Sequence, residues 1–288
     1  MNKLPGVFDR NIAIVCNPFA GGGKALEVTQ VIMKQLEAGK MSFTVFQNNW
    51  PDDLIGFTEA WIVGGDGTLN FFINRYPGIK IPFAIFKGGT GNDFHSLLYG
   101  KRSLEEQLEL VLTVAAKPVD AGRCNENLFI NGVGIGFEGA VAESVLGKKK
   151  KSGKTSFMIA VLRKILFYRS RFYSIQSTEL KSEQKSLMIS VCNGRWAGGG
   201  FQVAPLAQAD DGWLDVVIIK AISPLLRIRW LPVIDRGKHL RLSFVSHFKI
   251  RKIIVESNQI IQSHLDGEVY QNKRLEIEIL PGKYLIYH

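Results

Sequence analysis

Hydrophobic positions in the first part of the chain alternate between short apolar runs and helical spacing. The helical pattern covers Lys24 to Ala38 and is followed by Gly39, which can serve as a C-cap. A capping box at Ser103 and Glu106 opens another helix, expected to end at Ala116. The predicted strands are Asn11–Cys16, Phe43–Phe46, Trp61–Val63 and Phe83–Phe86. This alternation predicts a Rossmann-like α/β domain with a parallel sheet over residues 1–118.

Beyond Pro118 the pattern changes to strand-like stretches separated by turn residues, which is typical of an antiparallel β-sandwich. The predicted strands are Leu128–Val133, Phe172–Gln176, Leu187–Cys192, Leu214–Ile219, Leu240–Val245, Lys252–Glu256 and Leu275–Ile279. A basic, helical insertion over about residues 138–168 interrupts them. We therefore expect a β-rich domain over residues 119–288, whose extreme C-terminus can pack back onto the first domain. The ligand site is expected in a cleft between the two domains.

Composition narrows the class of protein. The chain has 288 residues, of which 46% are hydrophobic and 22% charged. This composition supplies enough apolar material for two cores and argues against wholesale disorder. Cys16, Cys124 and Cys192 are scattered without metal or redox spacing, so we expect buried, reduced thiols. The N-terminus lacks the apolar stretch of a signal peptide, and no uncharged apolar run reaches the length of a membrane span. These features predict a cytoplasmic protein.

The net charge of +10 is concentrated in three segments: Lys148 to Lys154, Arg163 to Arg171, and Arg227 to Arg241. The last two mix basic residues with apolar and aromatic ones, as segments at a membrane surface do. Core elements with extended Arg side chains would give the same pattern. No recognisable nucleic-acid module is present, so a nucleic-acid partner is not expected.

Two glycine loops after successive predicted strands carry the strongest chemical signal. The first runs from Gly64 to Thr68 around Asp66, and the second from Gly88 to Asp93. Glycine lets backbone N–H groups approach a phosphate, and the Asp can hold Mg²⁺ or accept a proton. A third loop, Asn17 to Lys24, is not a Walker A motif because no Ser or Thr follows Lys24. The pattern predicts a phosphoryl-transfer site.

Other motifs are ambiguous by themselves. Gly134 to Gly139 matches G-x-G-x-x-G, but it lies in the β-rich half and lacks an acid about 20 residues on, so we interpret it as a close strand approach that places Glu138 near the cleft. Asp266 with Gly267 favours a hairpin turn. Asp210 to Asp215 is either a turn or a metal loop. The histidines show no metal spacing.

Together these motifs resemble the diacylglycerol kinase catalytic-domain family, in particular the bacterial soluble lipid kinases, which are related to sphingosine and ceramide kinases and more distantly to NAD kinases. The resemblance covers nearly the whole chain. It is carried by Asn17-Pro18 with Gly21 to Gly23, Gly64 to Thr68, Gly89 to Asp93, Val119-Asp120, Asn131 to Gly136, Pro205 with Asp211 to Val216, and Asp266 to Glu268.

The resemblance implies an ATP- and Mg²⁺-dependent kinase that phosphorylates a lipid hydroxyl, such as that of diacylglycerol or a sphingoid base. Asp66 would be the central carboxylate and Glu268 an alternative general base, with Thr90, Asp93 and Asp120 ordering the network. Asp211, with the carbonyls of Gln208 and Trp213, would hold a structural Mg²⁺, and Glu138 would face the lipid head group. The implied nucleotide-binding residues are Asn17, Gly22, Gly64, Gly65, Gly67, Thr68, Gly89, Asn92 and Asp266.

The sequence departs from the family pattern at one position, and it leaves alternative functions open. Lys87 occupies a position where the family commonly has Pro. An NAD kinase-like enzyme with a soluble substrate would share the first loop, and a non-catalytic nucleotide- or lipid-binding regulator would share the fold. The implied partner is a lipid substrate at a membrane surface, reached by peripheral association through the basic and aromatic segments. A homodimer is among the assemblies that the sequence leaves open.

Overall fold

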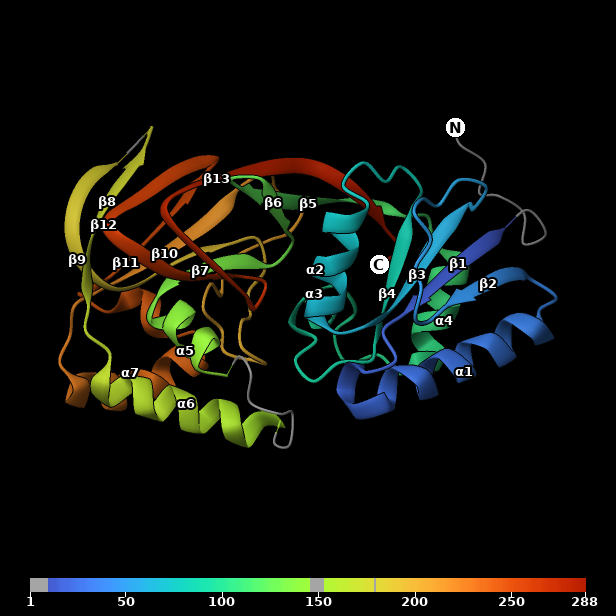
Figure 1. The fold of residues 1–288 in the computed structure, drawn as a ribbon, viewed down its shortest axis with the longest axis horizontal. Coiled ribbons are helices and arrows are strands. Elements are labelled where there is room, and N and C mark those ends of the chain that lie inside the picture. The colour runs from blue at the N-terminus through green and yellow to red at the C-terminus, as the bar shows by residue number, and fades with distance from the viewer. Residues whose placement is uncertain (1–9, 146–152, 179) are drawn as a thin grey trace. The chain divides into compact units, whose positions relative to one another are not determined.

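The computed structural model describes residues 10–145, 153–178 and 180–288 (Figure 1). The chain divides into two compact units. Unit 1 comprises Met1–Val119 and Gly282–His288, and unit 2 comprises Asp120–Pro281. The last seven residues of the chain thus belong to the same unit as its N-terminal part.

Unit 1 contains parallel strands in the order β2-β1-β3-β4. They are β1 (Asn11–Cys16), β2 (Ser42–Phe46), β3 (Glu59–Gly64) and β4 (Phe83–Lys87). Strands β1 and β3 are buried almost throughout, as expected for continuous apolar strands covered on both faces. Beside β4, Ile286 pairs in parallel with Phe83, and the Tyr99 hydroxyl donates to the carbonyl of Tyr287 at 2.6 Å. These contacts hold the C-terminal residues in unit 1.

Helices connect the strands of unit 1. They are the 3-10 turn η2 (Ala20–Gly23), α1 (Lys24–Ala38), α2 (Asp66–Arg75), α3 (Asp93–Tyr99) and α4 (Leu104–Thr113). Helix α1 buries Ala25, Ile32 and Leu36 in a core with Trp61 and Phe86 of the sheet. The predicted capping box at Ser103 is present. Helix α4 ends at Thr113, earlier than predicted, because the backbone of Val114 is already extended ahead of the next strand.

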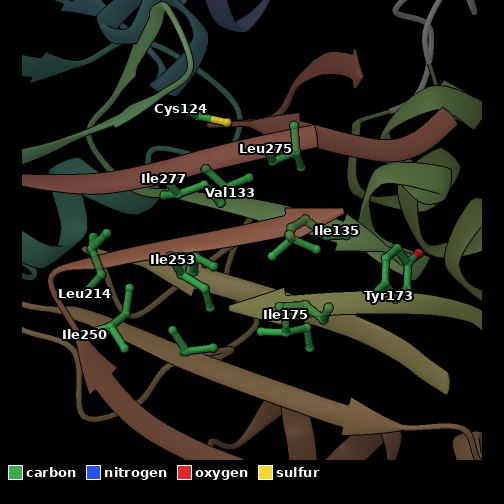
Figure 2. Close-up of a cluster of buried hydrophobic side chains, with 14 of the residues drawn as sticks. Cys124, Val133, Ile135, Tyr173, Ile175, Leu214, Ile250, Ile253, Leu275 and Ile277 are labelled. Atoms are coloured by element: carbon green, nitrogen blue, oxygen red, sulfur yellow. The ribbon is translucent and has the colours of Figure 1, made fainter. Parts of the chain in front are cut away.

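Unit 2 is mainly antiparallel, with strand order β11-β10-β9-β7-β12-β13, while β8 pairs with β9 and β12 and β5 pairs with β6 and β13. The strands are β5 (Lys117–Cys124), β6 (Asn127–Phe129), β7 (Gly132–Gly136), β8 (Arg171–Ser177), β9 (Lys181–Cys192), β10 (Leu214–Lys220), β11 (Val245–Ile250), β12 (Lys252–Leu265) and β13 (Glu268–Ile286). Figure 2 shows the apolar core that they share, with Val133 and Ile135 of β7 beside Ile175 and Ile253. These core positions alternate along each strand, because successive side chains of a strand point to opposite faces of the sheet.

The basic insertion forms α5 (Phe137–Val145) and α6 (Gly153–Phe167), and α7 (Pro224–Asp235) packs against α6. Val141, Val161 and Ile165 form the small core of these helices, with Leu231 of α7 against it. The run Lys148 to Lys151 lies outside the described residues. Among the helices that the structure describes, none combines the length and apolar composition needed to cross a bilayer.

Two strand predictions were wrong. Leu240–Val245 is not a strand: residues His239–Arg241 form the 3-10 turn η3, and β11 begins only at Val245. Its apolar residues pack as a loop, because His239 is fully buried with Nε2 3.0 Å from the carbonyl oxygen of Val203. The predicted strand Leu128–Val133 is divided into β6 and β7, because the intervening backbone N–H groups donate to the Asp266 side chain.

Strand β5 was not predicted, and β12 and β13 are longer than predicted. The three cysteines are buried and free, as predicted.

Candidate functional site

Three loops of unit 1 lie against one another at the carboxyl ends of β1, β3 and β4. The Asn17 backbone N–H donates to the carbonyl of Val63 at 3.1 Å, and its side-chain amide donates to the Thr68 hydroxyl at 3.2 Å. The Gly88 N–H donates to the carbonyl of Gly64 at 2.8 Å. The structure therefore brings the three glycine loops predicted from the sequence together, where parallel sheets commonly bind ligands.

Glycine is needed here for loop-to-loop packing. A Cβ atom on Gly89 would lie 2.4 Å from the Cα of Gly65, and one on Gly21 would lie 2.4 Å from the carbonyl oxygen of Gly88. Gly22 and Gly23 differ: both have positive φ, and a Cβ on either would meet nothing within 4 Å. They lead directly into α1, so the open side of this loop is where a ligand can approach.

Asp66 is the first residue of α2 and links it to α3. Its carboxylate accepts the backbone N–H of Asp93 at 2.9 Å and that of Phe94 at 3.1 Å. Burial raises the pKa of Asp66, and these amide hydrogen bonds lower it in part. The carboxylate is thus fixed in direction by two amides of the second loop, with a greater affinity for a proton than an exposed Asp has.

The second loop is shaped by Asn92, which has positive φ and is buried. Its side chain accepts the Gly89 N–H at 2.9 Å and donates to the Gly89 carbonyl at 2.8 Å. Asp93 is also buried, whereas Thr90 is exposed. Of the predicted residues, Asn92 therefore stabilises the loop by hydrogen bonds from its side chain to the Gly89 backbone, and Thr90 is exposed to solvent.

The joined loops fit the phosphates of a nucleotide. The N-cap residues of α1 and α2 make no side-chain hydrogen bond to the first turn, which leaves N–H groups there for a ligand, and Lys24 is the first residue of α1. Magnesium that arrives with a nucleotide typically takes one or two carboxylates together with phosphate oxygens. Asp66 supplies one such carboxylate at the loops.

In unit 2, Asp266 ties the turn between β12 and β13 to the break between β6 and β7. Its carboxylate accepts the backbone N–H groups of Ile130, Asn131 and Gly132, each at 2.9 Å. Its own N–H donates to the carbonyl of Gly132 at 3.0 Å. Glu268, two residues further on, begins β13 and is exposed. Asp266 thus fixes the turn that presents Glu268.

Glu138 lies in the first turn of α5, opposite β9 and β12. Its Oε1 accepts the Ser190 hydroxyl at 2.9 Å, and its Oε2 lies 3.8 Å from Nε2 of His264. A Cβ on Gly134 would meet both side chains, at 2.2 and 2.3 Å, so the first glycine of the G-x-G-x-x-G motif makes room for this pair. The third, Gly139, lies directly on the backbone of Gln262.

The proton positions of this pair follow from their neighbours. His264 Nδ1 accepts the Gly267 N–H at 3.2 Å, which leaves the proton of the neutral ring on Nε2, facing Glu138. Burial raises the pKa of Glu138 to about 7 and lowers that of His264 to about 4. Near neutral pH, His264 is uncharged and Glu138 can exchange its proton.

Asp120 is buried and organises the loop that carries Asp211. The Asp120 N–H donates to the carbonyl of Ala209, and its carboxylate accepts the Gly212 N–H, both at 2.7 Å. The side-chain amide of Asn193 donates to the Asp120 carbonyl at 2.9 Å. The structure therefore brings Asp120 to the predicted metal loop of unit 2.

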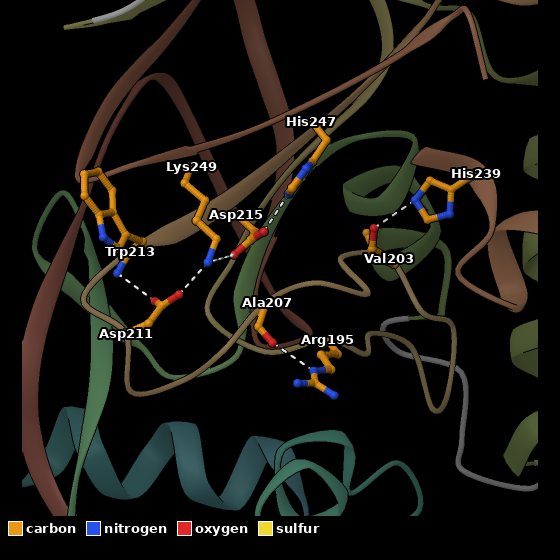
Figure 3. A network of polar contacts seen from close by, with 9 residues as sticks. All are labelled: Arg195, Val203, Ala207, Asp211, Trp213, Asp215, His239, His247 and Lys249. Atoms are coloured by element: carbon orange, nitrogen blue, oxygen red, sulfur yellow. Dashed lines mark hydrogen bonds and ion pairs between the residues drawn. The ribbon is translucent and has the colours of Figure 1, made fainter. Parts of the chain in front are cut away.

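Figure 3 shows the polar network around that loop. Asp211 accepts the Trp213 N–H at 3.0 Å and the Lys249 ammonium at 2.5 Å. Lys249 also lies 3.9 Å from the fully buried Asp215, whose other oxygen is 2.6 Å from Nε2 of His247. The Asp211 carboxylate raises the pKa of Lys249.

This arrangement does not fit a structural magnesium ion on Asp211. Magnesium needs oxygen ligands at about 2.1 Å in an octahedron, whereas the Lys249 ammonium already contacts Oδ2 of Asp211, so an ion bound to this oxygen would lie beside a positive charge.

Sequence reasoning missed Lys249, His247, His264 and Ser190. Each lies on a strand of unit 2 and reaches its acidic partner from a different strand or helix. The only signal in the sequence was the alternation of β11, which places His247 and Lys249 on one face. No local pattern indicated which acid they would meet.

Two family models match the chain. The diacylglycerol kinase catalytic domain matches residues 11–124, and the YegS C-terminal NAD kinase beta sandwich-like domain matches residues 131–288. The chain therefore joins an α/β kinase catalytic domain to a β-sandwich-like domain.

Individual proteins agree with these models. A Shewanella frigidimarina protein named "Probable lipid kinase YegS-like" is 30% identical over 226 residues, 76% of this chain and 73% of that protein. A Pseudomonas aeruginosa protein of the same name is 28% identical over 91% of this chain and 89% of its own length. A solved Bacillus anthracis structure of the diacylglycerol kinase class has the same fold, with a TM-score of 0.80 and 24% identity over 100% of this chain and 98% of that chain. From the domain that spans more than half of it and from these relatives, the chain belongs to the YegS-like family of lipid kinases.

Proposed function

We propose that this kinase transfers the γ-phosphoryl group of magnesium-bound ATP to the hydroxyl of a lipid such as diacylglycerol or a sphingoid base. The observation that carries the proposal is Asp66, which the backbone amides of Asp93 and Phe94 hold at the junction of three glycine loops. These loops, with the uncapped N-termini of α1 and α2, provide donors for phosphate oxygens. Phosphoryl transfer depends mainly on such positioning and charge neutralisation.

In the proposed reaction, the lipid hydroxyl oxygen forms a bond to the γ-phosphorus and the bond from that phosphorus to the β-phosphate oxygen breaks, releasing ADP. The hydroxyl proton passes to a carboxylate. Asp66 suits this role because burial raises its pKa towards the operating pH, where a general base is most effective. Glu268 is the alternative acceptor. Bound magnesium would neutralise charge on the phosphates.

Glu138 is proposed to contact the lipid head group. Its Oε1 is occupied by the Ser190 hydroxyl, and its pKa of about 7 allows it either to donate or to accept a hydrogen bond near neutral pH. A group that can do both suits an alcohol, which also donates and accepts. The proposal predicts that Glu138 affects the affinity for lipid more than the rate of phosphoryl transfer.

The lipid substrate requires docking at a bilayer, and we propose the outer face of α6 and α7 for this role. On α6, Ile159, Leu162, Leu166 and Phe167 are exposed and share one face by helical spacing. On α7, Leu225 is 79% exposed and Ile228 46%. We call these six residues the α6–α7 patch. Its buried counterpart, Val161 and Ile165, already packs in unit 2.

The charge of this region supports an anionic lipid surface as the proposed occupant. Arg163 and Arg229 are exposed beside the α6–α7 patch. The sequence from Ser144 to Thr178 contains no Asp or Glu and many Lys and Arg. Each Lys or Arg near an anionic leaflet contributes about 1 kcal/mol to binding. Arg227 is excluded from this role, because it is buried and donates to the carbonyls of Ile165 and Tyr168, which joins α7 to the end of α6.

The kinase activity is tested with radiolabelled ATP and a panel of lipid alcohols in mixed micelles, with NAD as a soluble acceptor. We expect label in a lipid for the wild type and a kcat about 10²- to 10⁴-fold lower for Asp66→Asn. Circular dichroism serves as the folding control. Label in NAD but in no lipid would contradict the proposal, as would a fully active, folded Asp66→Asn variant.

The docking surface is tested by sedimentation with phosphatidylglycerol-containing vesicles and with phosphatidylcholine vesicles. The double variant Arg163→Glu with Arg229→Glu should bind anionic vesicles about tenfold or more weakly, and Leu162→Glu with Leu166→Glu should also lose binding. Ile55→Glu is the matched control, because Ile55 is 85% exposed in unit 1 and outside the patch. Equal binding by all variants would place the docking surface elsewhere.

A further inference from the structure

The ammonium of Lys249 lies between two carboxylates of unit 2. It is 2.5 Å from Oδ2 of Asp211 and 3.9 Å from Oδ2 of Asp215. Asp215 is fully buried, and among the described residues its Oδ2 accepts no hydrogen bond, so Lys249 is the cation that faces this oxygen. A buried carboxylate needs such compensation, because it has lost its hydration.

Sheet register holds Lys249 in this position. Lys249 of β11 is the direct cross-strand partner of Asp215 in β10, and His247 lies on the same face of β11 and contacts the other Asp215 oxygen. The guanidinium of Arg251 adds positive charge near the loop, 4.7 Å from the centre of the Trp213 ring. Because strand pairing positions Lys249, its ammonium is present at this loop whether or not a metal is bound.

The loop itself is complete without a metal. Asp211 accepts the Trp213 N–H, and Asp120 accepts the Gly212 N–H, so both turn amides are satisfied by carboxylates. Since the ammonium occupies the remaining Asp211 oxygen, an ion placed there would meet a fixed positive charge. The chemistry that a structural ion would supply at this loop, charge neutralisation and a link from loop to sheet, is already provided by Lys249.

We propose that Lys249 replaces the structural magnesium ion that the family resemblance implies at Asp211, so that unit 2 folds and keeps this loop in place without a divalent metal. The inference concerns Asp211, Asp215 and Lys249 only, and it does not depend on the identity of the acceptor. It leaves open the magnesium that accompanies the nucleotide in unit 1.

The test is the thermal unfolding midpoint of the nucleotide-free protein, measured in EDTA and in saturating magnesium chloride. We compare the wild type with Lys249→Met, Asp211→Asn, and the double variant. Lys252→Met is the matched control, because Lys252 is a more exposed lysine of β12 whose two acidic partners, Glu276 and Glu278, are also more exposed than Asp215. Leaving nucleotide out separates this loop from the magnesium of the kinase reaction.

We expect the same wild-type midpoint in both solutions. In EDTA, Lys249→Met should unfold about 5 °C lower, and magnesium should restore part of that loss, because the loop carboxylates become available to the ion. The restoration should disappear in the double variant, and Lys252→Met should show neither effect.

Three outcomes would overturn the proposal: a wild-type midpoint that rises with magnesium and ceases to do so in Asp211→Asn, a Lys249→Met variant as stable as the wild type in EDTA, or a destabilised variant that magnesium leaves unchanged. If Lys249→Met folds only with magnesium, the proposal is supported. If Lys249→Met folds under neither condition, the proposal is tested by the wild type and Asp211→Asn alone. In that comparison the proposal requires that magnesium leave the unfolding midpoint of the wild type unchanged.

Discussion

Asp66 in unit 1 and Glu138 in unit 2 are partly buried acids set between glycines, but they receive different hydrogen bonds. The Asp66 carboxylate accepts two backbone N–H groups from the first turn of α3. Glu138 accepts one hydroxyl, from Ser190, and faces an uncharged His264. Burial raises the pKa of both, and that of Glu138 reaches about 7. The two carboxylates therefore differ in the kind and number of their hydrogen-bond donors, while burial raises the pKa of both.

The glycines around the two acids also differ, in what each of them packs against. In unit 1, Gly65 and Gly89 bring two backbones into contact, so the loops hold each other. In unit 2, Gly134 makes room for the side chains of Glu138 and His264. A glycine that faces a backbone cannot be replaced without moving a loop, whereas one that faces side-chain ends leaves more room for adjustment. This contrast predicts a rigid carboxylate in unit 1 and an adjustable one in unit 2.

Gly89→Ala should have the largest effect on stability. Its Cβ would lie 2.4 Å from the Cα of Gly65, so the two loops must separate. We expect a loss of about 3 kcal/mol or more in the free energy of unfolding, together with weaker ATP binding, measured by chemical denaturation and calorimetric titration. Gly78→Ala is the control, since a Cβ there meets nothing within 4 Å. Equal stability of the two variants would show that the loops are not in contact.

Glu138→Gln should change the pH dependence of stability. The pKa of Glu138 is raised from 4.5 to about 7, so the folded state holds this proton more tightly and the wild type loses stability as pH rises from 4.5 to 7. The full pKa shift corresponds to a loss of about 3 kcal/mol in the free energy of unfolding. The variant lacks this loss and should be the more stable protein above neutral pH, in urea unfolding across a pH series. A wild type whose stability does not fall over that window would contradict the shift.

His264 gives the opposite sign and serves as an internal control. Its pKa is lowered from 6.5 to about 4, so stability is lost as pH falls from 6.5 to 4. Glu138→Gln should leave this acid-side loss in place.

Ser190→Ala should have the smallest effect. It removes the one hydroxyl that donates to Glu138, at a cost of about 1 kcal/mol near or above neutral pH. With no donor left on that oxygen, the pKa of Glu138 should rise further, which nuclear magnetic resonance titration of a labelled Glu side chain can detect. An unchanged titration would mean that the number of donors does not control this acid.

Local patterns predicted much of unit 1. Continuous apolar runs located β1, β3 and β4, and the capping box located the start of α4. Because the carboxyl ends of parallel strands share one edge of a sheet, the sequence also predicted a ligand site at the glycine loops that follow these strands. In unit 1, the loops that lie side by side can therefore be inferred from the order of strands and helices along the chain.

Unit 2 was less predictable, because its contacts depend on register between distant strands. Asp266 divides the predicted strand Leu128–Val133 by accepting N–H groups from residues more than 130 positions away. The segment after His239 has the apolar composition of a strand but forms a 3-10 turn and loop, with the His239 ring bonded to the carbonyl of Val203. Neither effect has a signature in its own segment, since each arises from a hydrogen bond formed only after the sheet has assembled.

The sequence by itself determined the two classes of structure, the glycine loops around Asp66 and the resemblance to lipid kinases. All of these depend on residue types at short spacing, and short spacing fixes local geometry. Only the tertiary structure decided which polar side chains meet: Lys249 with Asp211 and Asp215, and His264 with Glu138. Cross-strand register and burial determine these pairs, because a side chain's charged partner and its pKa depend on what the folded sheet places beside it and on how much water it excludes.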